Sequence, residues 1–171
     1  MKVQRVSEHI YSLRAWMIVP IHVWLVQGKE GLTLVDAGVS PMTKGIMRAV
    51  EHIGHGPIQR VLLTHGHIDH VGALSGILAK NPVPVSIHES ELAYAEGRLP
   101  YPGRNKAQQT LKPGVATALA MSGAEIGGLV PHHTPGHSPG HSTGHVVYYH
   151  PADGVLLSVM TRYIRKSEYN T

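Results

Sequence analysis

The chain of 171 residues contains no cysteine. Disulfide bonds and thiolate metal ligands are therefore excluded, and any bound metal must use nitrogen and oxygen ligands. The absence says little about the cellular compartment, because many proteins of every compartment lack disulfides. No serine or cysteine nucleophile with an adjacent base is evident either, so covalent catalysis is not predicted.

Long hydrophobic runs are also absent. The apolar run at residues 15–26 is too short to span a bilayer and is interrupted by Pro20 and His22. No basic segment with a cleavage site precedes this run, so no signal peptide is predicted. We therefore expect a cytoplasmic protein that does not contact the membrane.

Charge is sparse, with 15% charged residues and a net charge of +4. Three basic residues, Arg162, Arg165 and Lys166, lie within the last ten positions, so the body of the chain is closer to neutral. No basic stripe interleaved with aromatic residues is present, which disfavours a nucleic-acid partner. The hydrophobic content of 42% and the length predict one globular domain with a core of its own.

Histidine is abundant, with fourteen residues, and it clusters. The segment LLTHGHIDHVG at residues 62–72 places His65, His67, Asp69 and His70 directly after an apolar strand. Imidazole and carboxylate groups are ligands that zinc prefers. Two alternate histidines, His65 and His67, can reach one metal from an extended loop, while Asp69 and His70 can face a second.

Hydrophobic periodicity predicts an α/β class, because strands alternate with helices along most of the chain. Strands are expected at 9–14, 21–26, 31–38, 58–64, 83–88, 129–133, 146–150 and 154–160, and helices at 40–54, 71–80 and 89–97. Ser40 is the expected N-cap of the first helix and Gly54 its stop. Residues 97–128, rich in glycine and proline, are interpreted as a lid, a loop insertion or a solvated connector.

The histidine segment resembles the HxHxDH motif of the metallo-β-lactamase fold superfamily. The similarity extends to LTLVDAG, which resembles a strand ending in Asp-x-Gly, and to HTPGHSPGH, which resembles the segment with the next metal histidine. The resemblance covers about residues 5–158, which we treat as one domain, 1–158. It implies an αββα sandwich, one or two Zn²⁺ ions held by loops, and a hydroxide between the metals that attacks an ester, thioester, lactone or lactam carbonyl. It also implies a catalytic role for Asp69.

Two further site residues are implied by the same resemblance. Asp36 is expected beside the metal ligands, where a carboxylate can orient a ligand histidine, or else as a strand-end residue that bonds local amides. For the third histidine ligand, the upstream spacing favours His137 and the downstream spacing favours His141, because the loop is lengthened by one four-residue unit. The remaining histidines of this region, His132, His133, His145 and His150, are expected to be structural or exposed.

The chain departs from the family pattern after Leu157. Ser158, Val159 and Met160 stand where many members have Ser-Gly-Asp with a bridging aspartate. Residues 159–171 form an atypical basic tail, and the expected terminal metal histidine is absent. We therefore expect a truncated or altered C-terminus that lacks the last elements of the fold, a weakened second metal position, and an exposed sheet edge that favours homo-oligomers.

Three hypotheses about function follow. The first is a zinc-dependent hydrolase of a small carbonyl substrate, closer to glyoxalase II or a lactonase than to a defensive β-lactamase. The second is a non-catalytic metal-binding fragment of this fold. The third is a di-iron oxidoreductase, which would normally carry an acidic ligand in the first motif and the bridging aspartate.

Overall fold

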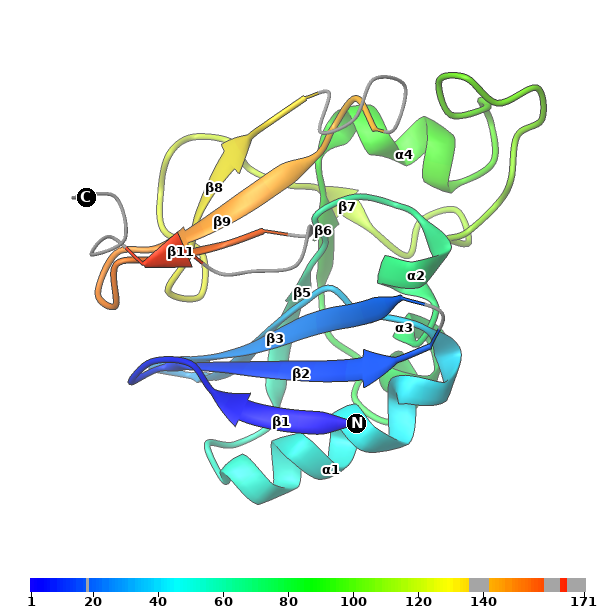
Figure 1. Ribbon diagram of the computed structural model, residues 1–171. Helices are drawn as coiled ribbons and strands as arrows, with labels where there is room; N and C mark the ends of the chain where they lie inside the picture. Colours follow the sequence, from blue (N-terminus) through cyan, green and yellow to red (C-terminus); the bar gives the residue numbers. More distant parts are fainter. Residues whose placement is uncertain (18, 136–141, 159–163, 166–171) are drawn as a thin grey trace.

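Two β-sheets form the framework of the protein. The structure is a computed structural model that describes residues 1–17, 19–135, 142–158 and 164–165 (Figure 1). The first sheet has seven strands in the order β1 to β7: β1 Lys2–Arg5, β2 Ile10–Trp16, β3 Pro20–Gly28, β4 Gly31–Val35, β5 Ile58–Leu62, β6 Val85–Ile87 and β7 Thr117–Ala118. The second has the order β11-β10-β9-β8: β8 Val130–His133, β9 Val146–His150, β10 Val155–Leu157 and β11 Ile164–Arg165.

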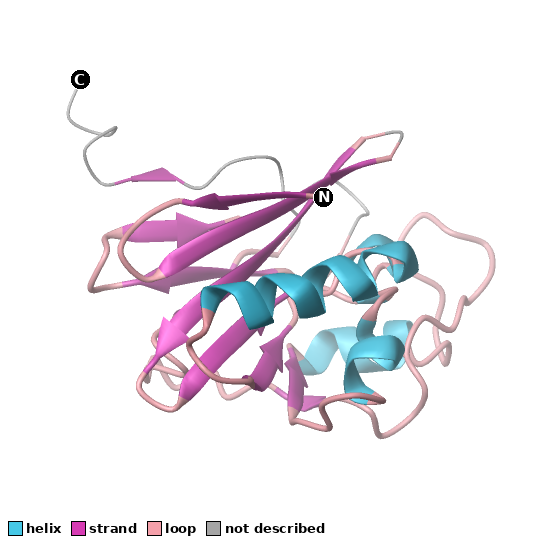
Figure 2. Cartoon of the chain, turned by 90° about the horizontal axis from the view of Figure 1, so that it is seen from below, coloured by secondary structure: helices cyan, strands magenta, loops and turns pink. Residues whose placement is uncertain are grey.

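Four α-helices cover one face of the seven-stranded sheet: α1 Thr43–Ile53, α2 Ile68–Val71, α3 Leu74–Leu78 and α4 Glu89–Ala95. Each contributes buried residues to the core on that face, and Figure 2 shows them gathered beside the strands. The other face packs against the four-stranded sheet through a second core. The layers are therefore helix, sheet and sheet.

The two cores follow from the two-residue period of the central strands. In β3, Val23 and Leu25 pack toward the helices, whereas Trp24 and Val26 pack toward the second sheet. All four are almost completely buried. A strand with apolar residues on both faces reads as a continuous hydrophobic run, which is why the 21–26 run belongs to the middle of a sandwich.

Most predicted elements are present, with shifted ends. The helix predicted over 40–54 begins with a 3-10 turn at Ser40–Met42, and the Ser40 side chain makes no capping bond, so the expected N-cap is wrong. Instead, the Ser40 carbonyl accepts a hydrogen bond from Thr43 Oγ1 at 2.8 Å. The helix ends as predicted at Gly54, whose φ of 71° is favourable for glycine.

Residues 97–128 are more than a solvated connector. They contain β7, which extends the seven-stranded sheet in parallel with β6. They also bury Tyr101, Leu111 and Leu119. A role as a lid stays a prediction, although the segment packs against the histidine loop as described below.

The C-terminal tail is described at two residues. Ile164 and Arg165 form β11, whose backbone pairs antiparallel with β10. The rest of the predicted tail lies outside the described residues. None of the helices in the described ranges has the length and apolar character that crossing a membrane requires.

Candidate metal centre

Four histidine side chains come together where β5 ends and β9 begins. The loop after β5 carries His65 and His67, α2 carries His70, and His145 directly precedes β9. The ring centroid of His65 lies 4.7 Å from that of His67, 4.2 Å from that of His70 and 5.6 Å from that of His145. All four residues are buried. Clustered buried imidazoles repel one another when they are positively charged, so they cannot all be imidazolium ions at once. The neutral imidazole is the form that binds a metal.

Three of these rings are oriented through their Nδ1 atoms. Thr64 Oγ1 lies 3.1 Å from Nδ1 of His65, and Thr134 Oγ1 lies 2.8 Å from Nδ1 of His145. Nδ1 of His70 lies 2.9 Å from Asp36 Oδ2. When a protein oxygen holds one ring nitrogen, the tautomer and ring direction are set, and the other nitrogen becomes the candidate ligand atom. Nε2 is thus the candidate ligand atom in His65, His70 and His145.

Asp36 is fully buried and links the strand end to the histidine loop. Its Oδ1 accepts hydrogen bonds from the Thr64 backbone N–H at 2.8 Å and from Thr64 Oγ1, and its Oδ2 contacts His70. The backbone φ of Asp36 is +59°, a left-handed conformation that aspartate tolerates better than most residues. The structure therefore places Asp36 where the sequence expects it, beside a candidate ligand histidine.

Asp69 and His70 form an acid–imidazole pair at the edge of the cluster. Asp69 Oδ2 lies 3.3 Å from His70 Nε2, and the Asp69 side chain is 48% exposed. The hydrogen bond and charge of His70 lower the pKa of Asp69 to about 2. Burial lowers the pKa of His70, but the charge and hydrogen bond of Asp36, with those of Asp69, outweigh it and raise the pKa to about 9. In the metal-free protein, His70 is thus an imidazolium between two carboxylates.

Glu91 of α4 is a central residue that the sequence did not reveal. It is completely buried, and its carboxylate accepts hydrogen bonds from the Gly66 N–H at 3.1 Å, Tyr101 OH at 2.9 Å, Ser142 Oγ at 2.6 Å and the Gly144 N–H at 2.9 Å. These donors belong to the loop of His65 and His67, to the 97–128 segment and to the segment before His145. Glu91 therefore fixes the relative positions of these three segments.

Residues 97–128 pack directly on the histidine loop. The Tyr101 ring lies 4.3 Å from the His67 ring, and Thr110 Oγ1 donates to the Gly66 carbonyl. A side chain at position 66 would collide with Tyr101 OH and the Ala95 Cβ, at 2.5 and 2.6 Å from an added Cβ. Glycine between His65 and His67 is therefore required by close packing with α4.

Two predicted ligands, His137 and His141, lie outside the described residues. The structure does describe the end of the segment that follows them. Three four-residue units follow one another, TPGH, SPGH and STGH, and the last of them ends with His145 beside His65. His145 was expected to be structural or exposed, and it is buried, because Ser142 and Gly144 are bound to Glu91 and direct the chain inward. His132 and His133 are exposed, as expected.

The family model described as Metallo-beta-lactamase superfamily matches residues 17–158. The chain belongs to the metallo-β-lactamase superfamily. The probable metallo-hydrolase YybB of Bacillus subtilis is 34% identical over 167 residues, which cover 92% of this chain and 71% of YybB. The probable metallo-hydrolase YflN of the same organism is also 34% identical, over 75% of this chain and 46% of its own length.

Solved structures of the metallo-β-lactamase fold agree with this assignment. A class B3 di-zinc metallo-β-lactamase from an Alaskan soil metagenome superposes with a TM-score of 0.69 at 19% identity, covering 95% of this chain and 60% of that protein. A protein solved in a di-iron-bound form gives a TM-score of 0.62 at 27% identity, over 85% of this chain and 69% of its own. The chain thus spans about 60% of the length of the class B3 neighbour. These neighbours support a metal cofactor without fixing which metal it is.

The donor set of this metallo-β-lactamase fold member fits a metal. Two ligands on one tetrahedral zinc, with bonds of about 2.0–2.1 Å, lie about 3.3 Å apart. Asp69 Oδ2 and His70 Nε2 are separated by 3.3 Å. The two atoms are therefore close enough for one cation to bind both in place of the proton on His70 Nε2.

This arrangement predicts a pH dependence for the metal-free protein. The pKa of His70 is about 9 in the folded state against an ordinary 6.5, so its stabilising contribution is full below about pH 6.5. That contribution is lost as the pH rises through 9, and it amounts to about 3 kcal/mol. Urea unfolding of chelator-treated protein from pH 6 to 9.5 should show this decline, and His70→Gln should flatten it. A wild-type unfolding free energy that does not fall over this range would contradict the assignment.

Proposed function

We propose that this chain is a zinc-dependent hydrolase that cleaves a small carbonyl substrate, a thioester, lactone or β-lactam, with water as the nucleophile. The observation that carries the proposal is the buried imidazole cluster of His65, His67, His70 and His145, with the half-exposed Asp69 at its edge. Nitrogen-rich donors with an adjacent carboxylate suit zinc. When bound, zinc lowers the pKa of water to about 7 and polarises a carbonyl oxygen.

In this proposal, each residue has a separate task. His65, His67 and one further histidine hold the first metal, and Asp69 with His70 holds the second. Asp36 fixes the His70 ring through Nδ1. The ionised Asp69 carboxylate faces solvent on one side, so it can accept a hydrogen bond from the attacking water or hydroxide and direct it at the substrate.

The third histidine of the first metal position is proposed to come from the three repeated units. His137, His141 and His145 each end one unit. The contact of His145 with His65 supports the last unit, whereas the resemblance favours one of the first two. Zinc content of the three single alanine variants distinguishes them, since a ligand should lower zinc content far more than the other two histidines.

Asp69→Ala tests the catalytic part of the proposal. We expect a fall of about 10²–10⁴-fold in kcat/KM on the best of three substrates, a thioester, a lactone and a β-lactam. Zinc at the first position should be retained, because the histidines hold it without Asp69. The measurement is steady-state hydrolysis with zinc counted per chain in the same samples.

Ile68→Ala is the matched control, since Ile68 is the exposed neighbour in the same turn. It should keep both rate and zinc. Full activity in Asp69→Ala would exclude the proposed role of Asp69. Wild-type protein with zinc bound but no activity on any of the three substrates would favour the non-catalytic metal-binding fragment.

A further inference from the structure

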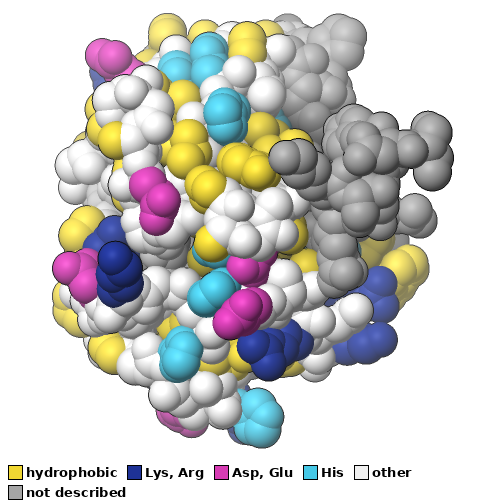
Figure 3. Space-filling view, turned by 90° about the vertical axis from the view of Figure 1, so that its left-hand side faces the viewer, with side chains coloured by type: hydrophobic (Ala, Val, Ile, Leu, Met, Phe, Trp, Pro, Cys, Tyr) yellow, Lys and Arg dark blue, Asp and Glu magenta, His cyan; other side chains and the backbone are white. Residues whose placement is uncertain are grey.

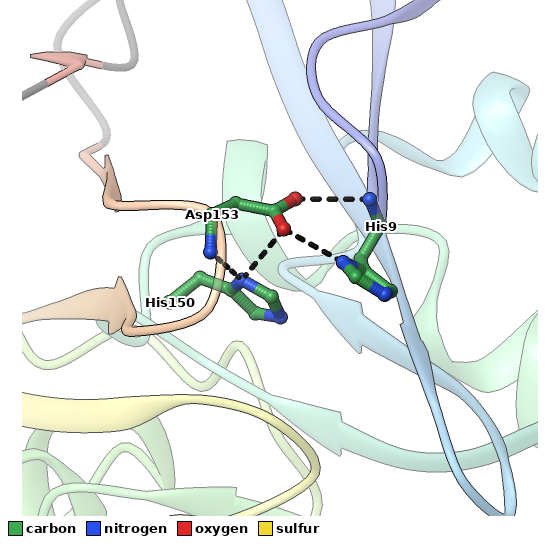
Figure 4. Close-up of side chains that lie close together, drawn as sticks. All are labelled: His9, His150 and Asp153. Carbon is green, nitrogen blue, oxygen red and sulfur yellow. Dashed lines mark hydrogen bonds and ion pairs between the residues drawn. The ribbon is translucent and has the colours of Figure 1, made fainter.

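A second cluster of potential metal ligands lies at the other end of β9. His9 precedes β2, His150 is the last residue of β9, and Asp153 lies in the turn to β10 (Figure 4). His145 and His150 are five residues apart along an extended strand, which corresponds to about 16 Å. This cluster is therefore separate from the His65 cluster, and it joins the two sheets at their common edge.

The geometry of the three side chains is that of a ligand set. Asp153 Oδ1 lies 2.6 Å from His9 Nδ1 and 3.6 Å from His150 Nδ1. One ligand atom from each residue lies within 4.8 Å of the other two. Two imidazole nitrogens and one carboxylate oxygen match the preference of Zn²⁺ and neighbouring divalent transition metals.

The hydrogen bonds show which atoms carry lone pairs. The backbone N–H of Asp153 donates to His150 Nδ1 at 3.1 Å, so this nitrogen is the unprotonated one of the ring, and a metal ion would have to take the place of that hydrogen bond. Asp153 Oδ2 is held by Ser7 Oγ at 2.5 Å and by the backbone N–H of His9 at 2.9 Å, which leaves Oδ1 for His9 and His150. His150 Nδ1 and Asp153 Oδ1 are therefore both acceptor atoms, 3.6 Å apart, and a cation that binds both would replace the hydrogen bonds that they now accept from the Asp153 N–H and from His9.

A pocket gives solvent access to the cluster. It has a volume of about 570 Å³ and is lined by His9, His150 and the carboxylate residues Glu30 and Glu125. Glu30 is paired with Arg60 at 2.9 Å. Histidine and acidic side chains are seen together on this side of the molecule (Figure 3). The pocket can supply the water ligands that complete the coordination of a metal held by three protein atoms.

We propose that His9, His150 and Asp153 form a metal site separate from the His65 cluster. This site binds one divalent transition metal ion of the zinc, nickel and copper group. The ion replaces the proton between His9 Nδ1 and Asp153 Oδ1, and these two atoms move apart from 2.6 Å to accommodate it. Because its ligands come from the β1–β2 connection and the β9–β10 turn, it clips the two sheets together. The site does not depend on the proposed hydrolase activity, since none of its residues lies in the His65 cluster.

The test compares metal content and stability in His9→Gln, His150→Gln and the control His55→Gln. His55 lines the same pocket, is exposed, and does not belong to the group of three. Chelator-treated protein is dialysed against micromolar Zn²⁺, and zinc is counted per chain. His9→Gln and His150→Gln should each bind one equivalent less than wild type and His55→Gln, and should lose part of the zinc-dependent rise in Tm. Hydrolysis, where wild type shows it, should stay unchanged in His9→Gln.

A second measurement on wild-type protein covers the case in which buried His150 does not tolerate substitution. Ni²⁺ added beyond the amount that saturates the His65 cluster should broaden the imidazole NMR signals of His9 and His150 as well as those of the His65 cluster. Broadening confined to the His65 cluster, or equal zinc content in wild type and His9→Gln, would overturn the proposal. The second result would mean that Asp153 serves only to hydrogen-bond the two turns. Neither result bears on the His65 cluster, so the two sites are tested separately.

Discussion

Glu91→Gln is expected to destabilise the protein by about 2–5 kcal/mol and to lower its metal content sharply. Four donors converge on the Glu91 carboxylate, two on each oxygen. A glutamine has only one side-chain oxygen, which can accept from two of these donors. Its amide group would replace the other carboxylate oxygen and would point its N–H groups at the remaining two donors. A buried donor left without an acceptor costs about 1–3 kcal/mol. Because those donors lie in the ligand loops, His65, His67 and His145 would lose their alignment.

The measurement is urea unfolding together with zinc counted per chain. Glu89→Gln is the matched control, because Glu89 is exposed on the same helix and should change neither quantity. The chelator-treated forms should also be compared, since a purely metal-mediated effect would vanish there. Unchanged stability and zinc content in Glu91→Gln would show that the ligand loops hold their positions without this carboxylate.

Asp36→Asn is expected to lower the affinity of the proposed Asp69–His70 position for its metal by about 10–100-fold, the usual effect of removing a group that orients a ligand histidine. Asparagine has the same shape and tolerates the positive φ of Asp36, so the backbone should not change. The negative charge disappears, however, and the pKa of His70 should fall from about 9 toward its ordinary value. The His70 ring should also lose its fixed tautomer.

NMR titration of the His70 ring in metal-free protein tests the expected fall in its pKa. Zinc binding at low free metal tests the expected loss of metal affinity. Asp153→Asn is a matched control, since it removes a carboxylate bonded to another histidine at the far end of β9. It should leave the His70 pKa unaltered. A His70 pKa that stays near 9 in Asp36→Asn would mean that Asp69 alone sustains the imidazolium.

Much of the fold could be predicted, because its strands carry strong signals. β3 and β4 are apolar on both faces, and the helix after them shows a clear apolar stripe and a glycine stop. The elements that escaped prediction include β1 and β7, and also α2 and β11. β1 is exposed at every residue, and β7 has only two residues, so neither has a period to detect. Each is positioned by backbone pairing with a neighbouring strand, β1 with β2 and β7 with β6, and not by its own sequence pattern.

The site was predictable where its residues are close in sequence. His65, His67, Asp69 and His70 share one short segment, and their spacing by itself indicates metal binding. Glu91 was not predictable, because it looks like its exposed neighbour Glu89 in the same helix. Only the three-dimensional approach of α4 to the histidine loop distinguishes them. His145 had a signal, the third Gly-His unit, but spacing alone could not say which unit reaches His65.

The anchoring of β9 has a consequence for how this chain can vary over evolution. Thr134 N–H donates to the His145 carbonyl at 2.8 Å, Val146 N–H to the Thr64 carbonyl at 2.9 Å, and Tyr148 OH to the Leu63 carbonyl at 2.8 Å. The two ends of the repeated segment are therefore tied together independently of its length. Gain or loss of one tetrapeptide by replication slippage would leave His145 and the whole of β9 in register, while it changes the number of histidines in the segment. Such a segment can change its histidine content without a loss of fold.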